Sequence, residues 1–448
     1  GRATRSASGR HEPRGRCAAR RRRRMEPLRF GSDVPFAEPG HLQGQRSPFY
    51  NEHHQRWRER CRDFVERELA PFAESWDEAG DIPVEELRVK AYAAGIYGAT
   101  WPREFGGTPP EGSEGPWHGS WEAVKVDPFF DLILWDELAR CGSGGLLAGL
   151  IVPTNIGLPP VLVYGSEALK ERLARPCITG EKACCLCVTE PGGGSDVAAV
   201  STTAVREGDF YVVNGAKKWI TGGMKADFFT VLVRTGAASE GRGGASMLVI
   251  ERGTPGITTR RMQTQGWWAS NTTYIEFDNV RVPAGNLVGQ EGQGFKYTMI
   301  NFNHERFVLT VQMLRFARIC VEDSIAFARR RKTFGKRLID HQVIRHKVAE
   351  MARGLEGTQR SLENYAYQVK CGVPDADLGG YMALVKVGGS KLMELCAREA
   401  SQILGGQSFT RGGAGSRVER IYREVRVMAI GGGSEEVMLN LAMAQAKL

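Results

Sequence analysis

The spacing of apolar residues changes twice along the chain, and this succession most limits the possible folds. Between about residues 50 and 180, apolar side chains recur every three or four residues, as in amphipathic helices. From 183 to 290, short strand-like segments without intervening helices predict an antiparallel β-domain. From Phe295 onward, four long helical segments predict a bundle, near 295–332, 339–371, 377–404 and 417–448. The expected fold is therefore α+β, with an N-terminal all-α domain, a middle antiparallel β-domain and a C-terminal four-helix bundle.

The predicted units are a disordered Arg-rich segment (1–45), a helical domain (46–182), a β-domain (183–290) and a helical bundle domain (291–448). A chain of 448 residues is long enough for two or three domains with a sizeable core. Two local signals add detail. Asn214-Gly215 is a strong turn signal between strand candidates, and Thr108 to Asp127, rich in Pro, Gly and Trp, predicts a long surface loop.

The positive charge of the chain is confined to one end. Residues 1–24 contain ten arginines and one glutamate, so they carry the whole net charge of +9. The remaining residues balance to zero, so no basic face and no nucleic-acid partner is expected for the folded body. Such a segment repels itself and cannot bury apolar surface, which predicts disorder. Its composition suits a mitochondrial transit peptide, a segment foreign to the native product or, least favoured, a nucleic-acid-binding arm.

Two further stretches could indicate a membrane span and a metal site, but neither interpretation is favoured. Cys141 to Ser166 carries no charge, but prolines and glycines interrupt it, which favours a buried helix and a loop over a membrane span. Cys184 and Cys187 form a Cys-x-x-Cys, but no second pair follows at zinc spacing, so no metal site is predicted. The C-terminal Ala446-Lys447-Leu448 follows the pattern of a peroxisomal address, with the mitochondrion as the alternative.

A glycine-rich loop is the first candidate for ligand binding. Neither a Gly-x-Gly-x-x-Gly after a strand nor a Gly-Lys-Ser/Thr loop is present, so a nucleotide must be bound in another way. Gly192 to Gly194, with Ser195 and Asp196, allow backbone N–H groups to approach a ligand closely. Taken alone, this loop is more often a tight turn. Arg331 offers a planar cation suited to a pyrophosphate, but its Arg-rich context is also typical of a solvated helix end.

Together these segments resemble the acyl-CoA dehydrogenase family. The resemblance rests on Leu186 to Asp196, Trp219-Ile220-Thr221, Arg331 to Lys336 followed by His341-Gln342, and Gln402 to Gly406. It implies FAD as cofactor, an acyl-CoA substrate and an electron-transfer flavoprotein or O2 as electron acceptor. It also implies a homodimer or homotetramer, because Arg331, Phe334 and the 402–406 segment would contact the FAD of a neighbouring subunit.

The resemblance assigns individual positions. The backbone of Leu186 and Val188 would meet the pyrimidine edge of the flavin, Thr189 would bond near N5, and Trp219 and Thr221 would cover the ring. The full set of implied flavin contacts is Leu186, Val188, Thr189, Ser195, Trp219, Thr221, Arg331, Thr333, Phe334, Gln342, Gln402, Gly405, Gly406, Ser434 and Glu436.

The catalytic base departs from the commonest family pattern. Removal of an α-proton from an acyl thioester suits a carboxylate whose pKa burial has raised. In most of the family this glutamate lies near the C-terminus, where this chain has Gly432. Isovaleryl-CoA and long-chain dehydrogenases instead place it on a bundle helix directly before an arginine. Glu305-Arg306 matches that arrangement, so Glu305 is the predicted base, although such a pair is more often a surface ion pair.

The implied substrate contacts are Ser195, Asn303, Arg306 and the backbone N–H of Gly432, which would polarise the thioester carbonyl. The expected activity is oxidation of an acyl-CoA to a trans-2-enoyl-CoA, with Glu305 as base and flavin N5 as hydride acceptor. Two alternatives stay open at this point: a flavin oxidase of another acid substrate, and a non-catalytic flavin-binding scaffold.

Overall fold

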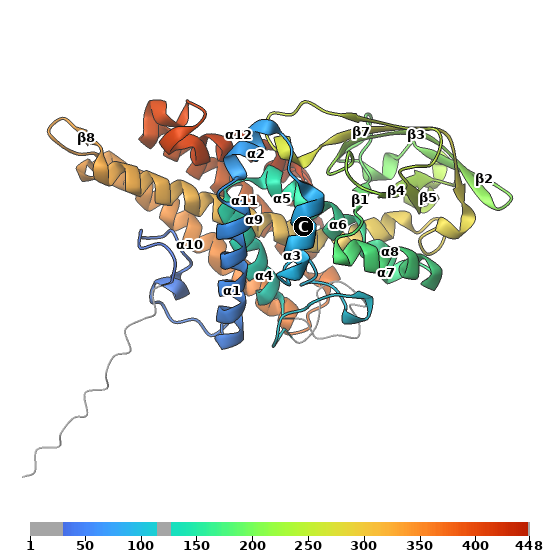
Figure 1. Ribbon diagram of the computed structural model, residues 1–448, viewed down its shortest axis with the longest axis horizontal. Coiled ribbons are helices and arrows are strands. Elements are labelled where there is room, and N and C mark those ends of the chain that lie inside the picture. The colour runs from blue at the N-terminus through green and yellow to red at the C-terminus, as the bar shows by residue number, and fades with distance from the viewer. Residues whose placement is uncertain (1–29, 114–126, 447–448) are drawn as a thin grey trace, which may run out of the picture.

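The computed structural model describes residues 30–113 and 127–446, without the side chains of Ile300 and Asn301. A helical N-terminal part, a curled β-sheet and a long helical bundle follow one another along the chain, and the sheet lies at one end of the molecule (Figure 1). This architecture confirms the predicted α+β fold. Most of the predicted loop 108–127, the Arg-rich residues 1–24 and the final Lys447-Leu448 lie outside the described residues.

The N-terminal part consists of short helices around the apolar helix α4 (Pro128–Leu138), all of whose residues are buried. The other helices are α1 (Glu52–Phe64), α2 (Ala73–Ala79), α3 (Val84–Ala93), α5 (Gly144–Leu150), α6 (Val152–Gly157), α7 (Pro159–Tyr164) and α8 (Glu167–Thr179). The uncharged stretch forms α5, α6 and α7 rather than a helix and a loop, because prolines at the starts of α6 and α7 favour new helices there. Within the described ranges, no single helix is long and apolar enough to cross a membrane, although α5 and the α6–α7 stretch pass that test as a pair bent by 62°.

The β-domain is a seven-stranded sheet in the order β1-β4-β2-β3-β7-β6, with β5 paired to β4. Its strands are β1 (Cys184–Cys187), β2 (Thr203–Glu207), β3 (Phe210–Ile220), β4 (Phe228–Arg234), β5 (Ala245–Glu251), β6 (Ile257–Arg261) and β7 (Thr273–Pro283). Most pairs are antiparallel as predicted, but β4 pairs in parallel with β1 and, at one position, with β2. The sheet is therefore mixed.

The predicted turn at Asn214-Gly215 is wrong. Both residues lie inside the continuous strand β3, where the register against β7 shifts between Val213 and Gly215. Gly215 has φ 142°, and a Cβ there would approach Thr202 Cα to 2.7 Å, so the glycine serves a β-bulge and a close contact. The hairpin turn is instead Gly208-Asp209, between the paired residues Glu207 and Phe210.

The bundle consists of α9 (Gly294–Arg330), α10 (Gln342–Lys370), α11 (Asp375–Leu404), α12 (Ser416–Ile430) and α13 (Glu435–Gln445). The last predicted segment is two helices, because Gly432 and Gly433 adopt left-handed φ values and end α12. Between α9 and α10, the short strands β8 (Lys332–Thr333) and β9 (Lys336–Arg337) form a hairpin that projects from the end of the bundle opposite the sheet (Figure 1).

The predicted disorder of residues 1–45 is wrong for residues 30–45. Glu38 is buried and ion-paired with Arg140 at 2.9 Å and Arg315 at 3.2 Å, while Ala37 and Leu42 join the buried residues. Burial alone would raise the pKa of Glu38, but these arginines and Arg62 lower it to about 2. The segment lacks periodicity, so its packing depends on arginines far along the chain that a local pattern does not reveal.

Candidate functional site

The loop of residues 188–196, called here the glycine loop, is held against β3 by a buried ion pair. Lys217 Nζ lies 2.7 Å from Glu190 Oε1 and also donates to Val188 O at 3.0 Å. The Glu190 carboxylate further accepts hydrogen bonds from Ser201 and Thr202. Burial alone would raise the pKa of Glu190, but Lys217 and these donors lower it to about 2. The glycine loop is therefore anchored to β3 through Glu190, although its glycines contribute no side chains.

Neither Glu190 nor Lys217 has a role in the sequence-based prediction. The signal that points to them is the alternation along β3, where Tyr211, Val213 and Lys217 all face inward. A lysine at an inward position requires a buried acceptor, and Glu190 stands within the motif itself.

The outer face of the glycine loop is open. An added Cβ at Gly192 would meet nothing within 4 Å, and Gly193 and Gly194 would meet only one atom each at 3.4 Å. These glycines are thus not required by internal packing, which leaves their backbone free to approach a ligand.

Trp219 lies at the end of β3 in a strained conformation. Its φ is 60°, in the left-handed region that bulky residues rarely adopt, and its side chain is 47% exposed. The ring is covered on one side by Lys218 Nζ, 4.5 Å from its centroid. Thr221 and Thr189 are half-buried, and Thr189 O accepts a hydrogen bond from Lys218 N at 2.9 Å, which brings the glycine loop beside this end of β3. An exposed, strained aromatic next to an open glycine loop suits the binding of a planar ring.

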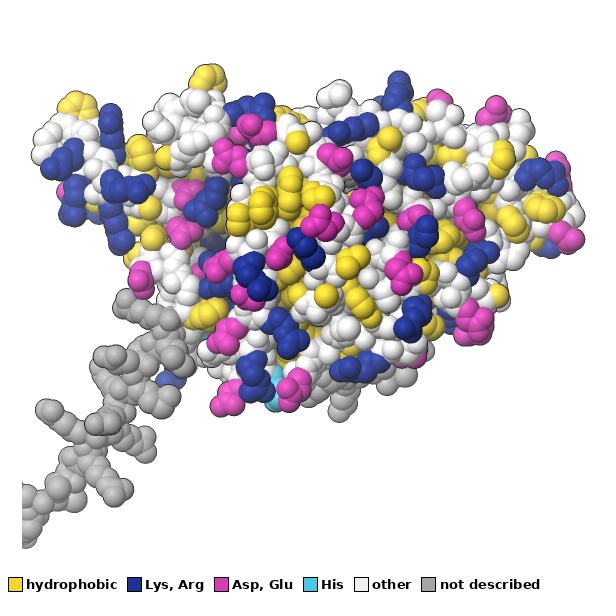
Figure 2. Space-filling model, viewed as in Figure 1, with side chains coloured by type: hydrophobic (Ala, Val, Ile, Leu, Met, Phe, Trp, Pro, Cys, Tyr) yellow, Lys and Arg dark blue, Asp and Glu magenta, His cyan; other side chains and the backbone are white. Residues whose placement is uncertain are grey.

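A second group of predicted flavin residues lies at the other end of the molecule. Phe334, at the tip of the β8–β9 hairpin, is 96% exposed, and Arg331 and Gln402 are also exposed. Lys and Arg side chains gather over this end (Figure 2). Thr333 Oγ1 lies 3.1 Å from His341 Nε2, which braces the hairpin against the start of α10. One chain does not bring this group to the glycine loop (Figure 1).

The predicted base, Glu305, is half-buried on α9 and lies close enough to raise the pKa of Arg306, which burial lowers. Arg306 is buried, and its Nε donates to Gly432 O at 2.9 Å. Its Nη1 donates to Asn303 Oδ1 at 3.0 Å, and Asn303 Nδ2 donates to Asp375 Oδ2 at 2.8 Å. The contacts of Arg306 and Asn303 within the chain therefore join the turn that contains Gly432 to the helical turn that carries Glu305.

His304, next to the predicted base, makes a buried contact with α4. Its Nε2 lies 2.7 Å from Asp131 Oδ2, and both side chains are 3% exposed. Burial raises the pKa of Asp131 to about 8 and lowers that of His304 to about 3. At neutral pH these shifts favour a protonated Asp131 and a neutral His304, and the pair links α4 to the turn of α9 that carries Glu305.

The remaining predicted residues are spread along the chain. Ser434 caps the start of α13, where its Oγ accepts a hydrogen bond from Val437 N at 3.5 Å, while Glu436 in the first turn is exposed. Ser195 is exposed on the glycine loop, Leu186 is buried in β1, and Val188 is half-buried directly after β1. At the hairpin end, Gln342, Gly405 and Gly406 are all exposed.

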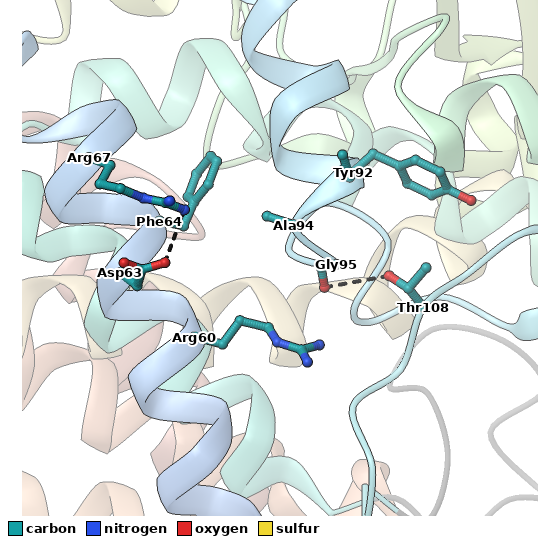
Figure 3. Close-up of a pocket in the computed structure, with 9 residues that line it drawn as sticks. Arg60, Asp63, Phe64, Arg67, Tyr92, Ala94, Gly95 and Thr108 are labelled. Carbon is teal, nitrogen blue, oxygen red and sulfur yellow. Dashed lines mark hydrogen bonds and ion pairs between the residues drawn. The ribbon is translucent and has the colours of Figure 1, made fainter.

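A cavity of about 510 Å³ lies elsewhere, between the end of α1 and the segment after α3 (Figure 3). Arg60 and Phe64 line it from α1, and Tyr92, Gly95 and Thr108 line it from the other side. None of the predicted site residues contributes to this cavity.

Comparisons with known proteins agree with the fold. Three domain families match: the acyl-CoA dehydrogenase N-terminal domain over 51–181, the middle domain over 185–280 and the C-terminal domain over 292–447. Acyl-CoA dehydrogenase AFT10-1 of Alternaria alternata is 39% identical over 93% of this chain and 96% of its own length. Acyl-CoA dehydrogenase apdG of Emericella nidulans is 38% identical over 92% and 95%.

Solved structures of acyl-CoA dehydrogenases superpose on most of the chain. A probable acyl-CoA dehydrogenase from Mycobacterium abscessus superposes with a TM-score of 0.81 at 36% identity, over 89% of this chain and all of that one. An acyl-CoA dehydrogenase from Bacillus anthracis, solved in complex with FAD, has a TM-score of 0.76 at 26% identity, over 89% of this chain and 67% of that one.

The fold and the glycine loop define a flavin-dependent oxidoreductase. More particularly, the chain belongs to the acyl-CoA dehydrogenase family. Its cofactor is FAD, and the open glycine loop and the exposed Trp219 fit that group.

Proposed function

We propose that the protein oxidises an acyl-CoA thioester to the trans-2-enoyl-CoA, with Glu305 as the general base. The observation that carries this proposal is the hydrogen bond from Arg306 Nε to Gly432 O, 2.9 Å long. It supports an arrangement in which the helical turn with Glu305 lies against the position where most of the family has its glutamate. Gly432 itself has no side chain that could accept a proton.

In this reaction Glu305 takes the proton from the carbon next to the thioester carbonyl. The backbone N–H of Gly432 donates to the carbonyl oxygen, where negative charge develops as the proton leaves. FAD held at the glycine loop and Trp219 would supply the hydride acceptor for the β-carbon. Asn303 and Arg306 fix the turn of α9 that presents the carboxylate.

The test is Glu305→Gln in protein that retains FAD. We expect its turnover with an acyl-CoA to fall by about 10²- to 10⁴-fold, the usual contribution of a general base. The matched control is Glu322→Gln on the same helix, because Glu322 pairs with Arg417 at 3.4 Å away from the site. Activity of Glu305→Gln within tenfold of wild type would exclude Glu305 as the base.

The complete site is proposed to form between subunits of a homodimer or homotetramer. This is supported by the separation of the two groups of flavin residues and by the near-complete exposure of Phe334. Sedimentation of the FAD-loaded protein tests it, and a monomer that retains FAD would refute it.

The electron acceptor is proposed to be an electron-transfer flavoprotein or O2. Anaerobic titration with a panel of acyl-CoAs, followed by flavin absorbance, identifies the substrate. Reoxidation by air or by the flavoprotein then separates an oxidase from a dehydrogenase.

A further inference from the structure

The turn of residues 431–433 between α12 and α13, called here the substrate turn, is fixed by two cations from other helices. Gly432 and Gly433 have φ values of 68° and 108°, and neither has a side chain to anchor it. A Cβ at Gly433 would lie 2.4 Å from Met438 Cε, so the backbone packs closely against α13. Arg306 from α9 binds Gly432 O, and Lys386 from α11 binds Gly433 O at 2.7 Å.

Lys386 is an unusual residue in this setting. It is 0% exposed, and its Nζ also donates to Ala429 O at 2.5 Å, in the last turn of α12. In the described part of the chain, no carboxylate forms an ion pair with it. Glu435, an acid close by on α13, instead accepts a hydrogen bond from Ser390. Because burying an ammonium group is expensive, a lysine that binds only two carbonyls is expected to have a specific task.

The direction of the peptide groups suggests that task. Peptide bonds are planar and trans throughout the described chain, so each C=O points away from the N–H of the same unit. The carbonyls of Gly432 and Gly433 face Arg306 and Lys386, and the N–H groups of Gly433 and Ser434 therefore face the opposite side. Within residues 30–113 and 127–446, no hydrogen bond uses the N–H of Gly432 or Gly433. The N–H of Gly433 therefore faces away from the two cations without an acceptor in the described chain, the adjacent N–H of Gly432 is also unused, and both residues are half-buried.

We propose that Lys386 is a positioning residue for the substrate's thioester carbonyl. By binding Ala429 O and Gly433 O, it holds the substrate turn so that its free N–H groups meet the carbonyl oxygen as negative charge develops there. This proposal rests on the proposed dehydrogenation and adds a residue that does not itself touch the substrate. Lys386 acts from the bundle side, and Arg306 completes the support from α9.

The experiment compares FAD-loaded Lys386→Met, which removes donor and charge, with Lys386→Gln, which keeps a neutral donor. Lys170→Met on α8 is the control for loss of a lysine, since Lys170 is half-buried and its ion pair in the described part of the chain is with Glu167 on the same helix. The measurements are FAD content, kcat and KM. They also include the dissociation constants of free CoA and of a 3-thiaacyl-CoA, whose acidic α-carbon can lose a proton without being oxidised.

We expect Lys386→Met to lower kcat by about 10- to 100-fold, somewhat less than removal of a direct donor to the oxyanion. Binding of the 3-thiaacyl-CoA should weaken about tenfold. Affinity for free CoA, which has no carbonyl at this place, should stay within about twofold, and FAD content should not change. The kcat and 3-thiaacyl-CoA affinity of Lys386→Gln should lie between those of Lys386→Met and wild type. Both quantities should be unchanged in Lys170→Met.

A Lys386→Met protein with wild-type kcat would overturn the proposal. Equal weakening of CoA and 3-thiaacyl-CoA, with loss of FAD, would also overturn it, because it would show a merely structural role. If Lys386→Met does not fold, the same comparisons on Lys386→Gln decide. If none of the acyl-CoAs reduces the flavin of the wild-type protein, the proposed dehydrogenation is refuted. The comparison of binding between free CoA and the 3-thiaacyl-CoA still tests the role of Lys386 in that case.

Discussion

The buried pair Glu190–Lys217 offers a quantitative test of how the glycine loop is held. Replacing Lys217 by Met removes an ammonium group that is 0% exposed and lies 2.7 Å from the Glu190 carboxylate. Glu190 then stays buried without its counter-charge, and breaking a buried pair in this way costs about 3–5 kcal/mol. Ser201 and Thr202 still donate to the carboxylate, so we expect a loss near 3 kcal/mol, at the lower end of that range.

The assay is denaturant unfolding of the apoprotein together with the ratio of bound FAD to protein. Lys182→Met is the matched control in the same domain. Lys182 pairs with Asp227 at 3.0 Å but is half exposed, so water screens the pair and its loss should destabilise the protein far less than loss of Lys217. The double variant Glu190→Gln/Lys217→Met removes both charges and should regain part of the lost stability. We expect FAD content to fall in the single variant, because Val188 O loses its donor.

The pH dependence of the free energy of unfolding gives an independent test of the contribution of Glu190. The folded-state pKa of Glu190, about 2, lies below its ordinary value of 4.5. Its contribution to stability is therefore present above pH 4.5 and lost as the pH falls toward 2. Lys217→Met should weaken this acid dependence. A Lys217→Met protein that unfolds within 1 kcal/mol of wild type and keeps its FAD would refute the reasoning. If the double variant is no more stable than Lys217→Met, the lost stability comes from altered packing and not from the unpaired buried charge of Glu190.

Two further predictions concern other parts of the molecule. Between about pH 6.5 and 8, the folded His304–Asp131 pair keeps a proton that the unfolded chain has released. The free energy of unfolding should therefore fall by up to about 1.4 kcal/mol per pH unit in this range, and Asp131→Asn should remove that slope in thermal or denaturant unfolding. Phe334→Ala should change the stability of the apoprotein by less than about 0.5 kcal/mol, because the ring is almost fully exposed. It should nevertheless lower FAD retention in gel filtration, and unchanged retention would argue against a shared site.

The sequence predicted the order of helical and β regions well because periodicity reports directly which face of an element is buried. The same patterns misplaced the turn at Asn214-Gly215, since this dipeptide also suits a bulge, and only the pairing of β3 with β7 distinguishes the two. Similarly, the 30–45 segment has no period of its own. Glu38 is held by Arg315 of α9 and by Arg140 in the turn after α4, and such long-range ion pairs leave no local signal.

At the site, sequence motifs located the glycine loop and the substituted Gly432. They could not reveal that Trp219 is strained or that Arg306 binds the backbone of the substrate turn, because both depend on the folded geometry. Lys386 is hidden for a similar reason. In a long helix a lysine is usually solvated, and only the position of α12 shows that this one is buried.

The position of the base along the chain can itself be tested by moving it. Position 432 lies against the α9 turn that carries Glu305, and an added Cβ there would lie 3.5 Å from Arg306 Cγ and 3.2 Å from Leu309 Cδ1. Glutamate at this position must adopt φ near 68°, which costs about 1–2 kcal/mol for an L-residue.

We therefore expect Gly432→Glu in the Glu305→Gln background to fold with slightly lower stability and to recover about tenfold or more of the lost turnover, well short of the whole contribution of a general base. Gly432→Gln in the same background is the control, since it has the same shape and strain but cannot accept the proton. Equal activity of the two double variants would show that a carboxylate at 432 cannot reach the substrate's α-carbon. Positions 305 and 432 would then not be interchangeable places for the catalytic carboxylate in this protein.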